Sequence, residues 1–118
     1  MKNLEELKNR AIESGFKYAY GRFEEEVTPP HLIVTSPESD NFSADDKVFL
    51  KVNSLILELT TTKKDLEIEN KIEENILYDV VWSKEETNID DENVYNVSYF
   101  FEIWRRKKQW VKTKLNLD

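Results

Sequence analysis

The chain has 118 residues, of which 39% are hydrophobic and 35% are charged, and this balance predicts a single globular domain with its own core. It contains no cysteine, which excludes disulfides, thiolate zinc sites and cysteine nucleophiles. The first residues contain no apolar signal-peptide core, and no apolar run of about 18 residues occurs anywhere. We therefore expect a cytoplasmic protein that is neither exported nor inserted in a membrane.

The net charge of −7 is distributed unevenly along the chain. Through Ile103 there are 11 lysines and arginines against 23 aspartates and glutamates, which gives −12; from Trp104 onward there are 6 against 1, which gives +5. We therefore expect an acidic domain over residues 1–103 and a basic C-terminal extension over residues 104–118. The acidic domain repels phosphate backbones, whereas opposite charges on one molecule favour complementary surfaces, including a second copy.

An amphipathic helix is predicted over residues 3–14, with Asn3 as its N-cap and Gly15 as the residue that ends it. Its buried face should contain four residues at helical spacing: Leu4, Leu7, Ala11 and Ile12. Alternating aromatic residues predict a strand over residues 16–23, and the prolines at 29 and 30 predict an extended turn before a short strand over residues 31–35.

Residues 36–46, SPESDNFSADD, combine turn-forming residues and carboxylates with one large apolar residue, Phe42. Two interpretations are open: a solvated loop with Phe42 on the core, or a projecting arm that contacts a partner. The carboxylates at Asp40, Asp45 and Asp46 lack the glycine and distal glutamate of a calcium-binding EF-hand loop.

The longest run of β-forming residues extends from Lys47 to Thr62 and should form the central strand. Its apolar face changes parity, because Val48, Leu50 and Val52 share one side whereas Leu55, Leu57 and Leu59 share the other. A strand that keeps one face on the core therefore needs a β-bulge near Asn53 and Ser54. The alternative is two shorter strands that meet there.

A second helix is predicted from Asp65, its N-cap, to about Leu77, followed by a strand from Val80 to Ile89, a turn, and a final strand from Val94 to Ile103. The apolar stripe of this helix consists of Ile68, Ile72, Ile76 and Leu77. The predicted order is α-β-β-β-α-β-β. The predicted fold is a two-layer α+β domain with a mainly antiparallel sheet of about five strands and two helices packed on one face.

The sequence contains no convincing catalytic, cofactor or metal site. His31 is the single histidine and has no second ligand at metal-binding spacing, and two glycines, Gly15 and Gly21, cannot form a phosphate-binding loop. We therefore expect a protein that is not an enzyme and has no cofactor or metal.

The basic C-terminal extension combines positive charge with tryptophans and contains Trp104, Arg105, Arg106, Lys107 and Lys108. Three interpretations are open: a protein-docking tail, a disordered tail, and a single-stranded nucleic-acid binder. In a helical tail, Trp104, Val111 and Leu115 would form a stripe.

Four stretches follow one another between Phe16 and Ile103: FEEEVTPPHLIV, NFSADDKVF, LILELTTTKKDLEIENKIEENI and VVWSKEETNIDDENVYNVSYFFEI. In this order they resemble small proteins encoded by tailed phages and prophages of Gram-positive bacteria. Those proteins belong to the head–tail joining set and are similar to tail-terminator, or tail-completion, proteins. The basic segment after Ile103 departs from the family pattern, so the resemblance implies nothing for it.

The resemblance implies a structural role in the virion, built in the host cytoplasm during assembly. The subunits would form a ring, often a hexamer, that caps the tail tube and presents a surface to the head–tail connector. Interface candidates in the family-like segment are Asn41, Phe42, Asp45 and Asp46. Two alternatives remain: another connector or adaptor of the joining region, and a nucleic-acid-binding module that uses the basic tail.

Overall fold

The computed structural model describes residues 1–44 and 47–106, and for residues 38–44, 47–51, 92, 105 and 106 it describes the backbone alone. The elements follow the predicted order: α1 (Leu4–Glu13), β1 (Lys17–Tyr20), β2 (His31–Ala44), β3 (Lys47–Thr61), α2 (Leu66–Asn75), β4 (Trp82–Ile89), a 3₁₀ turn (Asp90–Glu92) and β5 (Val94–Arg106). The α+β class and the element order predicted from the sequence are confirmed.

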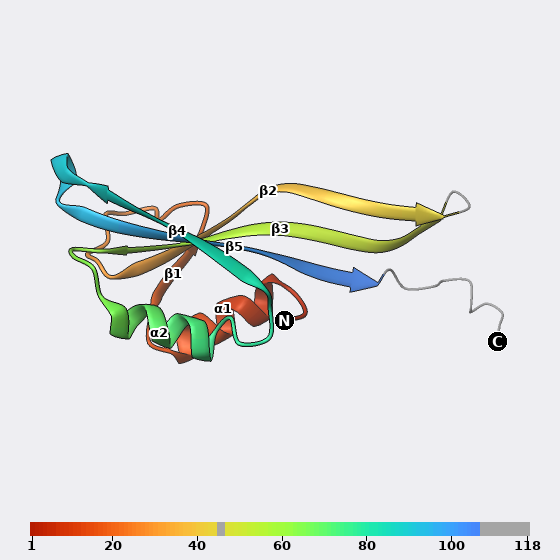
Figure 1. Cartoon of the computed structure of the whole chain (residues 1–118), viewed down its shortest axis with the longest axis horizontal. Helices are drawn as coiled ribbons and strands as arrows, with labels where there is room; N and C mark the ends of the chain where they lie inside the picture. Colours follow the sequence, from red (N-terminus) through yellow and green to blue (C-terminus); the bar gives the residue numbers. More distant parts are fainter. Residues whose placement is uncertain (45–46, 107–118) are drawn as a thin grey trace.

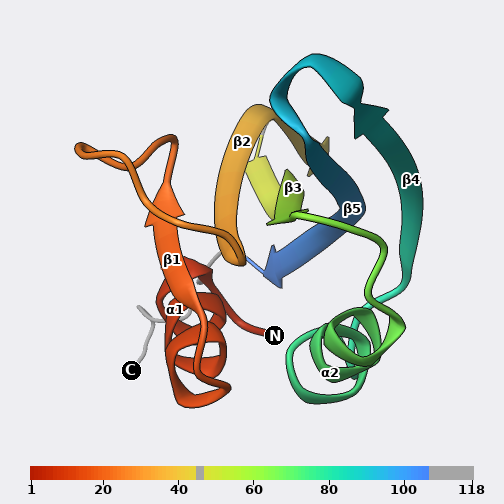
Figure 2. The same cartoon turned by 90° about the vertical axis from the view of Figure 1, so that its left-hand side faces the viewer.

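The five strands form one sheet in the order β1-β2-β3-β5-β4, and both helices lie on the same face (Figure 1). All neighbouring strands are antiparallel except β1 and β2, which run parallel with Lys17 opposite His31. Figure 2 shows α1 beneath β1, and α2 on the side of the sheet where β4 lies. Neither helix of the described residues lies over the opposite face of the sheet.

The core lies between the two helices and the covered half of the sheet. It combines apolar residues from α1, α2, β2, β3 and β5, all at most 5% exposed: Leu7, Ala11, Leu32, Val34, Leu55, Leu57, Leu59, Ile72, Ile76, Leu77, Val97, Tyr99, Phe101 and Ile103. Burial of this surface is the main source of stability, and it explains why the short helices persist.

The sheet is much longer than the helix layer. Each helix has 10 residues and spans about 15 Å, whereas the 15 residues of β3 span about 50 Å. The molecule accordingly measures 58 × 27 × 25 Å, and three strands run on past the helices (Figure 1). We call this three-stranded projection the arm; it comprises residues 39–44 of β2, 47–53 of β3 and 104–106 of β5.

The predicted loop over residues 36–46 is wrong for most of its length, because β2 continues to Ala44. Residues Glu38–Ala44 pair with Lys47–Ser54 of β3, and these backbone hydrogen bonds override the turn-forming composition. The backbone of this segment projects, as the second interpretation expects, and its contact with a partner stays a prediction.

The predicted bulge in β3 near Asn53 is also misplaced. The pairing of β3 with β5 runs without a break from Leu50 to Thr61, and the register shifts lie in the β2–β3 pairing, between Thr35 and Glu38 and between Phe42 and Ser43. From Leu50 to Thr61 the strand therefore keeps its alternation, and its apolar residues change faces where the helices end. The extra residue that β3 does contain is Phe49, because Phe42 and Ser43 pair with Leu50 and Val48.

The final strand extends three residues beyond its predicted end, to Arg106. Trp104 therefore lies in a strand, not at the start of a helical stripe. The rest of that proposed stripe, Val111 and Leu115, lies outside the described residues.

Candidate protein-docking surface

The uncovered face of the sheet becomes apolar where the arm begins. Leu55 points toward the helices, so by alternation Val52 points to the opposite face, where its register neighbour on β5 is Trp104. Val52 is 2% exposed, whereas Trp104 is 53% exposed and donates a hydrogen bond from its indole N–H to Glu102 at 3.2 Å. A large aromatic side chain is thus fixed on the surface at the base of the arm.

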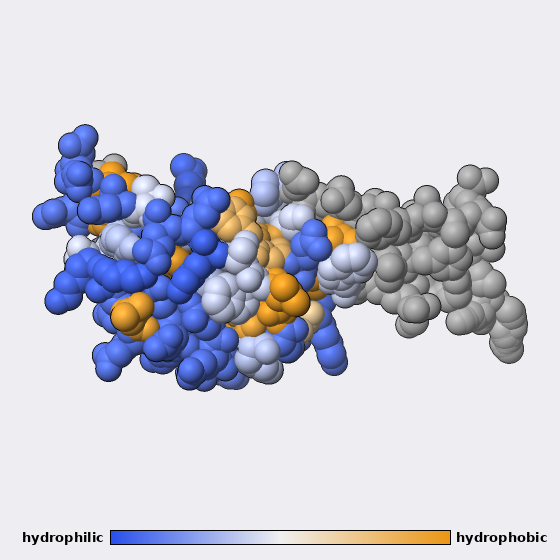
Figure 3. Space-filling view, viewed as in Figure 1, coloured by the Kyte–Doolittle hydropathy of each residue, from blue (hydrophilic) through white to orange (hydrophobic). Residues whose placement is uncertain are grey.

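A groove of about 890 Å³ lies beside Trp104, at the point where β4 begins. Its most exposed apolar side chain is Val81, at 93%, and Figure 3 shows apolar side chains gathered near the middle of the molecule. The lining includes two carboxylates, Asp79 and Glu102, and among the described residues it includes no lysine, arginine or histidine. Its apolar part consists of Met1, Pro37, Leu55, Ile56, Val80, Val81, Trp82, Phe100, Phe101 and Trp104.

The groove exists because β4 is shorter than β5. β4 begins at Trp82, opposite Phe101, so β5 runs on along the arm past the start of its neighbour. The chain that enters β4 from α2 passes the end of this edge and supplies Val80 and Val81 to the groove wall. Wall and edge together form a recess that is open to solvent.

The segment that enters β4 is held by an ion-pair cluster with α1. The Arg10 guanidinium donates to the Ile76 carbonyl at 2.9 Å and to both carboxylate oxygens of Asp79, at 2.8 and 2.9 Å. The N-terminal amine also contacts Asp79. These hydrogen bonds, that from Arg10 foremost, hold the pKa of Asp79 well below its ordinary value of 3.8, although partial burial opposes the shift.

Replacing Asp79 by Asn should lower the free energy of unfolding near pH 7 by about 1 kcal/mol; the effect is modest because the carboxylate is 35% exposed and water screens the ion pair. A lowered pKa contributes stability that is fully present above about pH 4 and is lost as the pH falls through the folded-state value. The difference between parent and variant should therefore be constant from pH 7 to about pH 4 and shrink between about pH 4 and pH 2. Urea unfolding across this range measures it, with Asp91→Asn in the exposed turn as control; a difference independent of pH would contradict the assignment.

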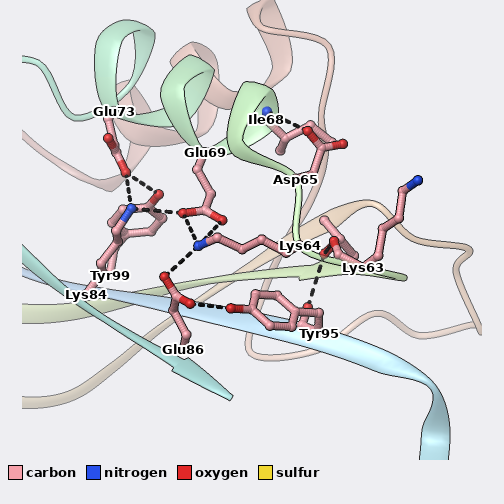
Figure 4. A network of polar contacts seen from close by, with 11 residues as sticks. Lys63, Lys64, Asp65, Ile68, Glu69, Glu73, Lys84, Glu86, Tyr95 and Tyr99 are labelled. Atoms are coloured by element: carbon pink, nitrogen blue, oxygen red, sulfur yellow. Dashed lines mark hydrogen bonds and ion pairs between the residues drawn. The ribbon is translucent and has the colours of Figure 1, made fainter. Parts of the chain in front are cut away.

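A second polar cluster lies between α2 and the sheet (Figure 4). The Glu69 carboxylate is 1% exposed and contacts the ammonium groups of Lys64 at 2.8 Å and of Lys84 at 2.9 Å. Lys84 also contacts Glu73 at 2.8 Å, and the Tyr99 hydroxyl donates to the same Glu73 oxygen at 2.7 Å. Every charge in the cluster has a partner, so the cluster fixes α2 to β4 and β5.

The same cluster offers little reactivity. Burial, together with its hydrogen bond to Glu73, raises the pKa of the Tyr99 hydroxyl, which keeps the phenol protonated. Lys84 loses some basicity through burial, but its bonds to Glu69 and Glu73 outweigh this and raise its pKa. Both groups therefore stay in their ordinary protonation states near neutral pH, in contrast to a general base or nucleophile.

His31 lies at the start of β2 and its ring packs edge-on against Phe23, with the ring centres 5.1 Å apart. Burial lowers its pKa. In the part of the chain that the structure describes, no three His, Asp or Glu residues lie close enough together to hold a metal ion.

The structure brings together some of the interface residues proposed from the sequence. Asn41 and Phe42 lie on β2 opposite Lys51 and Leu50, and Arg105 and Arg106 lie on β5 opposite the same two residues. Candidates 64 residues apart in the sequence thus flank the same two residues of β3. Four other candidates lie outside the described residues: Asp45, Asp46, Lys107 and Lys108.

The groove was not predicted from the sequence. Val80 and Val81 were assigned to a strand, because an apolar pair before a tryptophan is typical of a strand start. A signal was nevertheless present in the sequence. The later part of β4 is polar on both sides, so the apolar Val80 and Val81 do not belong to its pattern.

Comparisons with known proteins give no identification, since no family model matches the chain and no curated protein matches it. No helix within the described residues is long and apolar enough to cross a membrane.

Proposed function

We propose that this chain is a non-enzymatic structural protein of the head–tail joining region of a tailed phage. Its most specific form is a tail terminator that closes into a ring, caps the tail tube and docks to the head–tail connector. In this role it is made in the host cytoplasm and ends in the virion tail. The single observation that carries the proposal is the arm, which extends the sheet beyond the helices.

An exposed three-stranded arm is costly for a protein that acts alone. Its outer strands present backbone N–H and C=O groups that can pair with another chain, and monomeric proteins usually cover or blunt such edges. Here β1 covers β2 only along His31–Val34, and β4 reaches only Phe101 of β5. A second copy that packs against the arm would cover both the edges and the apolar base around Trp104.

Ring closure needs a heterologous contact, in which two different surfaces of the same chain meet. The arm and the helix-covered body are such different surfaces. The acidic body and basic C-terminal segment add charge complementarity between copies. The four stretches that resemble tail-terminator proteins, between Phe16 and Ile103, favour a ring over an open filament.

The test is the mass of the purified full chain in solution, measured by light scattering at several concentrations and salt levels, with negative-stain electron microscopy of the same samples. The proposal expects a closed oligomer near six subunits with a ring outline. An open series of masses that grows with concentration would contradict ring closure.

A connector or adaptor protein of the same joining region is the second candidate, because the same arm could bind a different protein. A chain that stays monomeric, and is captured by purified tail tubes or connectors, would favour this alternative. Nucleic-acid binding has weaker support, since the body through Ile103 carries a net charge of −12. A chain truncated after Ile103 should then bind DNA no less than the full chain.

A further inference from the structure

We propose that the groove beside β4 binds the C-terminal segment of a second copy, residues 107–118, and that this contact clasps neighbouring subunits together. The inference rests on the self-association proposed above and names one contact within it.

The groove selects for an apolar and positively charged occupant. Its walls expose Val81 and Trp104, and its two charged lining residues, Asp79 and Glu102, are carboxylates. Asp79 is neutralised by Arg10, whereas Glu102 is exposed on β5 and faces solvent beside the groove. An occupant with large apolar side chains and nearby lysines would bury Val81 and Trp104 and pair with Glu102.

Residues 107–118, KKQWVKTKLNLD, have this composition. Four lysines and one aspartate give the segment a net charge of +3. Its apolar residues are Trp110, Val111, Leu115 and Leu117. Tryptophan is among the residues that contribute most to protein interfaces when it enters a pocket.

The path of β5 favours a neighbour's groove over the chain's own. From Phe101, at the groove, to Arg106 the strand advances about 17 Å along the arm, away from the start of β4. Return to the same groove would need a reversal directly after the strand. Residues 107–118 contain no glycine or proline to form one, but when extended they reach about 40 Å, far enough to meet an adjacent subunit.

The groove also offers a backbone surface. The edge of β5 that follows Phe101 is not flanked by β4, so an extended segment can lie along it as an added strand. Alternate side chains of that segment would then point toward Val81 and Trp104.

The test uses a fluorescein-labelled peptide of residues 107–118 and a chain truncated after Arg106, whose described elements are all retained. We expect saturable binding, measured by fluorescence anisotropy, that weakens as salt is raised. Val81→Glu in the truncated chain should weaken binding at least tenfold, because it places a carboxylate in the apolar wall. Leu66→Glu, at another exposed apolar residue on the first turn of α2, should leave binding unchanged.

Absence of saturable binding, or equal binding by the Val81→Glu variant, would overturn the proposal. The full chain tests the second-copy assignment: at equal concentration its mass should exceed that of the truncated chain. A full chain that neither gains mass nor accepts the peptide would place the segment in its own groove and overturn the clasp between copies. The peptide assay does not depend on ring formation, so it separates the two proposals. A truncated chain that binds no peptide but still closes into rings would refute the clasp and leave the ring proposal standing.

Discussion

A chain in which Asn-Gly replaces residues 41–51 should stay folded but lose self-association. This change joins Asp40 to Val52, which face each other across β2 and β3, by the two-residue turn that suits such a hairpin. The body should keep its structure, because all the core residues that the structure describes lie outside the deleted segment. Light scattering should give a monomer at concentrations where the full chain is oligomeric, a fall in mass of about sixfold for a hexameric ring.

The matched control replaces only Asp45 and Asp46 by Asn-Gly, which changes the two residues between β2 and β3 in the sequence but keeps both strands. If the arm's strands make the contact, this control should assemble like the parent chain. If assembly depends on the two aspartates, as the sequence-based interface candidates suggest, the control should also be monomeric. A shortened chain that still forms the full oligomer would remove the arm from the interface.

Substitution of Lys84 by Met should cause the largest loss of stability among single changes in the polar cluster, about 3 kcal/mol in the free energy of unfolding. The change keeps most of the side-chain volume but removes the ammonium group that contacts Glu69 and Glu73. Glu69 would then remain 1% exposed with only Lys64 beside it, and the cost of a buried, poorly compensated carboxylate sets the size of the effect. Urea unfolding followed by circular dichroism measures it.

Lys63→Met is the matched control, because the Lys63 side chain points away from the cluster (Figure 4) and should change stability by less than about 0.5 kcal/mol. The double variant Glu69→Met, Lys84→Met removes the buried charge as well as its partner. It should therefore recover part of the stability lost in Lys84→Met. A double variant less stable than the single one would show that Glu69 stabilises the fold by contacts other than these ion pairs.

The parts of the fold that could be predicted are those encoded by neighbouring residues. Asn3 and Asp65 cap the two helices as expected, accepting hydrogen bonds from the backbone N–H groups of Glu6 and Ile68 at 2.8 and 3.2 Å. Gly15 has the positive φ, +90°, that its place at the end of α1 predicts. Capping and periodicity act within a few residues, so one sequence is enough to reveal them.

The parts that could not be predicted depend on pairing between distant segments. Residues 36–44 have the composition of a loop, and they form a strand because β3 lies beside them. The parity change in the central strand was detected correctly but explained wrongly. The prediction assumed one continuous core face, whereas the helices end before the strand does. The groove likewise arises from a difference in length between β4 and β5, which no local pattern records.

The unbroken pairing of β3 with β5 has a mechanical consequence. Because the twelve register pairs from Leu50 to Thr61 include both arm and core positions, β3 and β5 continue from the core into the arm without a break, whereas β2 has a register shift at the base of the arm. The direction in which the arm points is thus decided by the packing of Leu55, Leu57 and Leu59 against the helices. If subunits meet through their arms, the packing of the core would set the angle between neighbouring subunits. A substitution in the core, far from any contact between subunits, could then change the number of subunits in the ring.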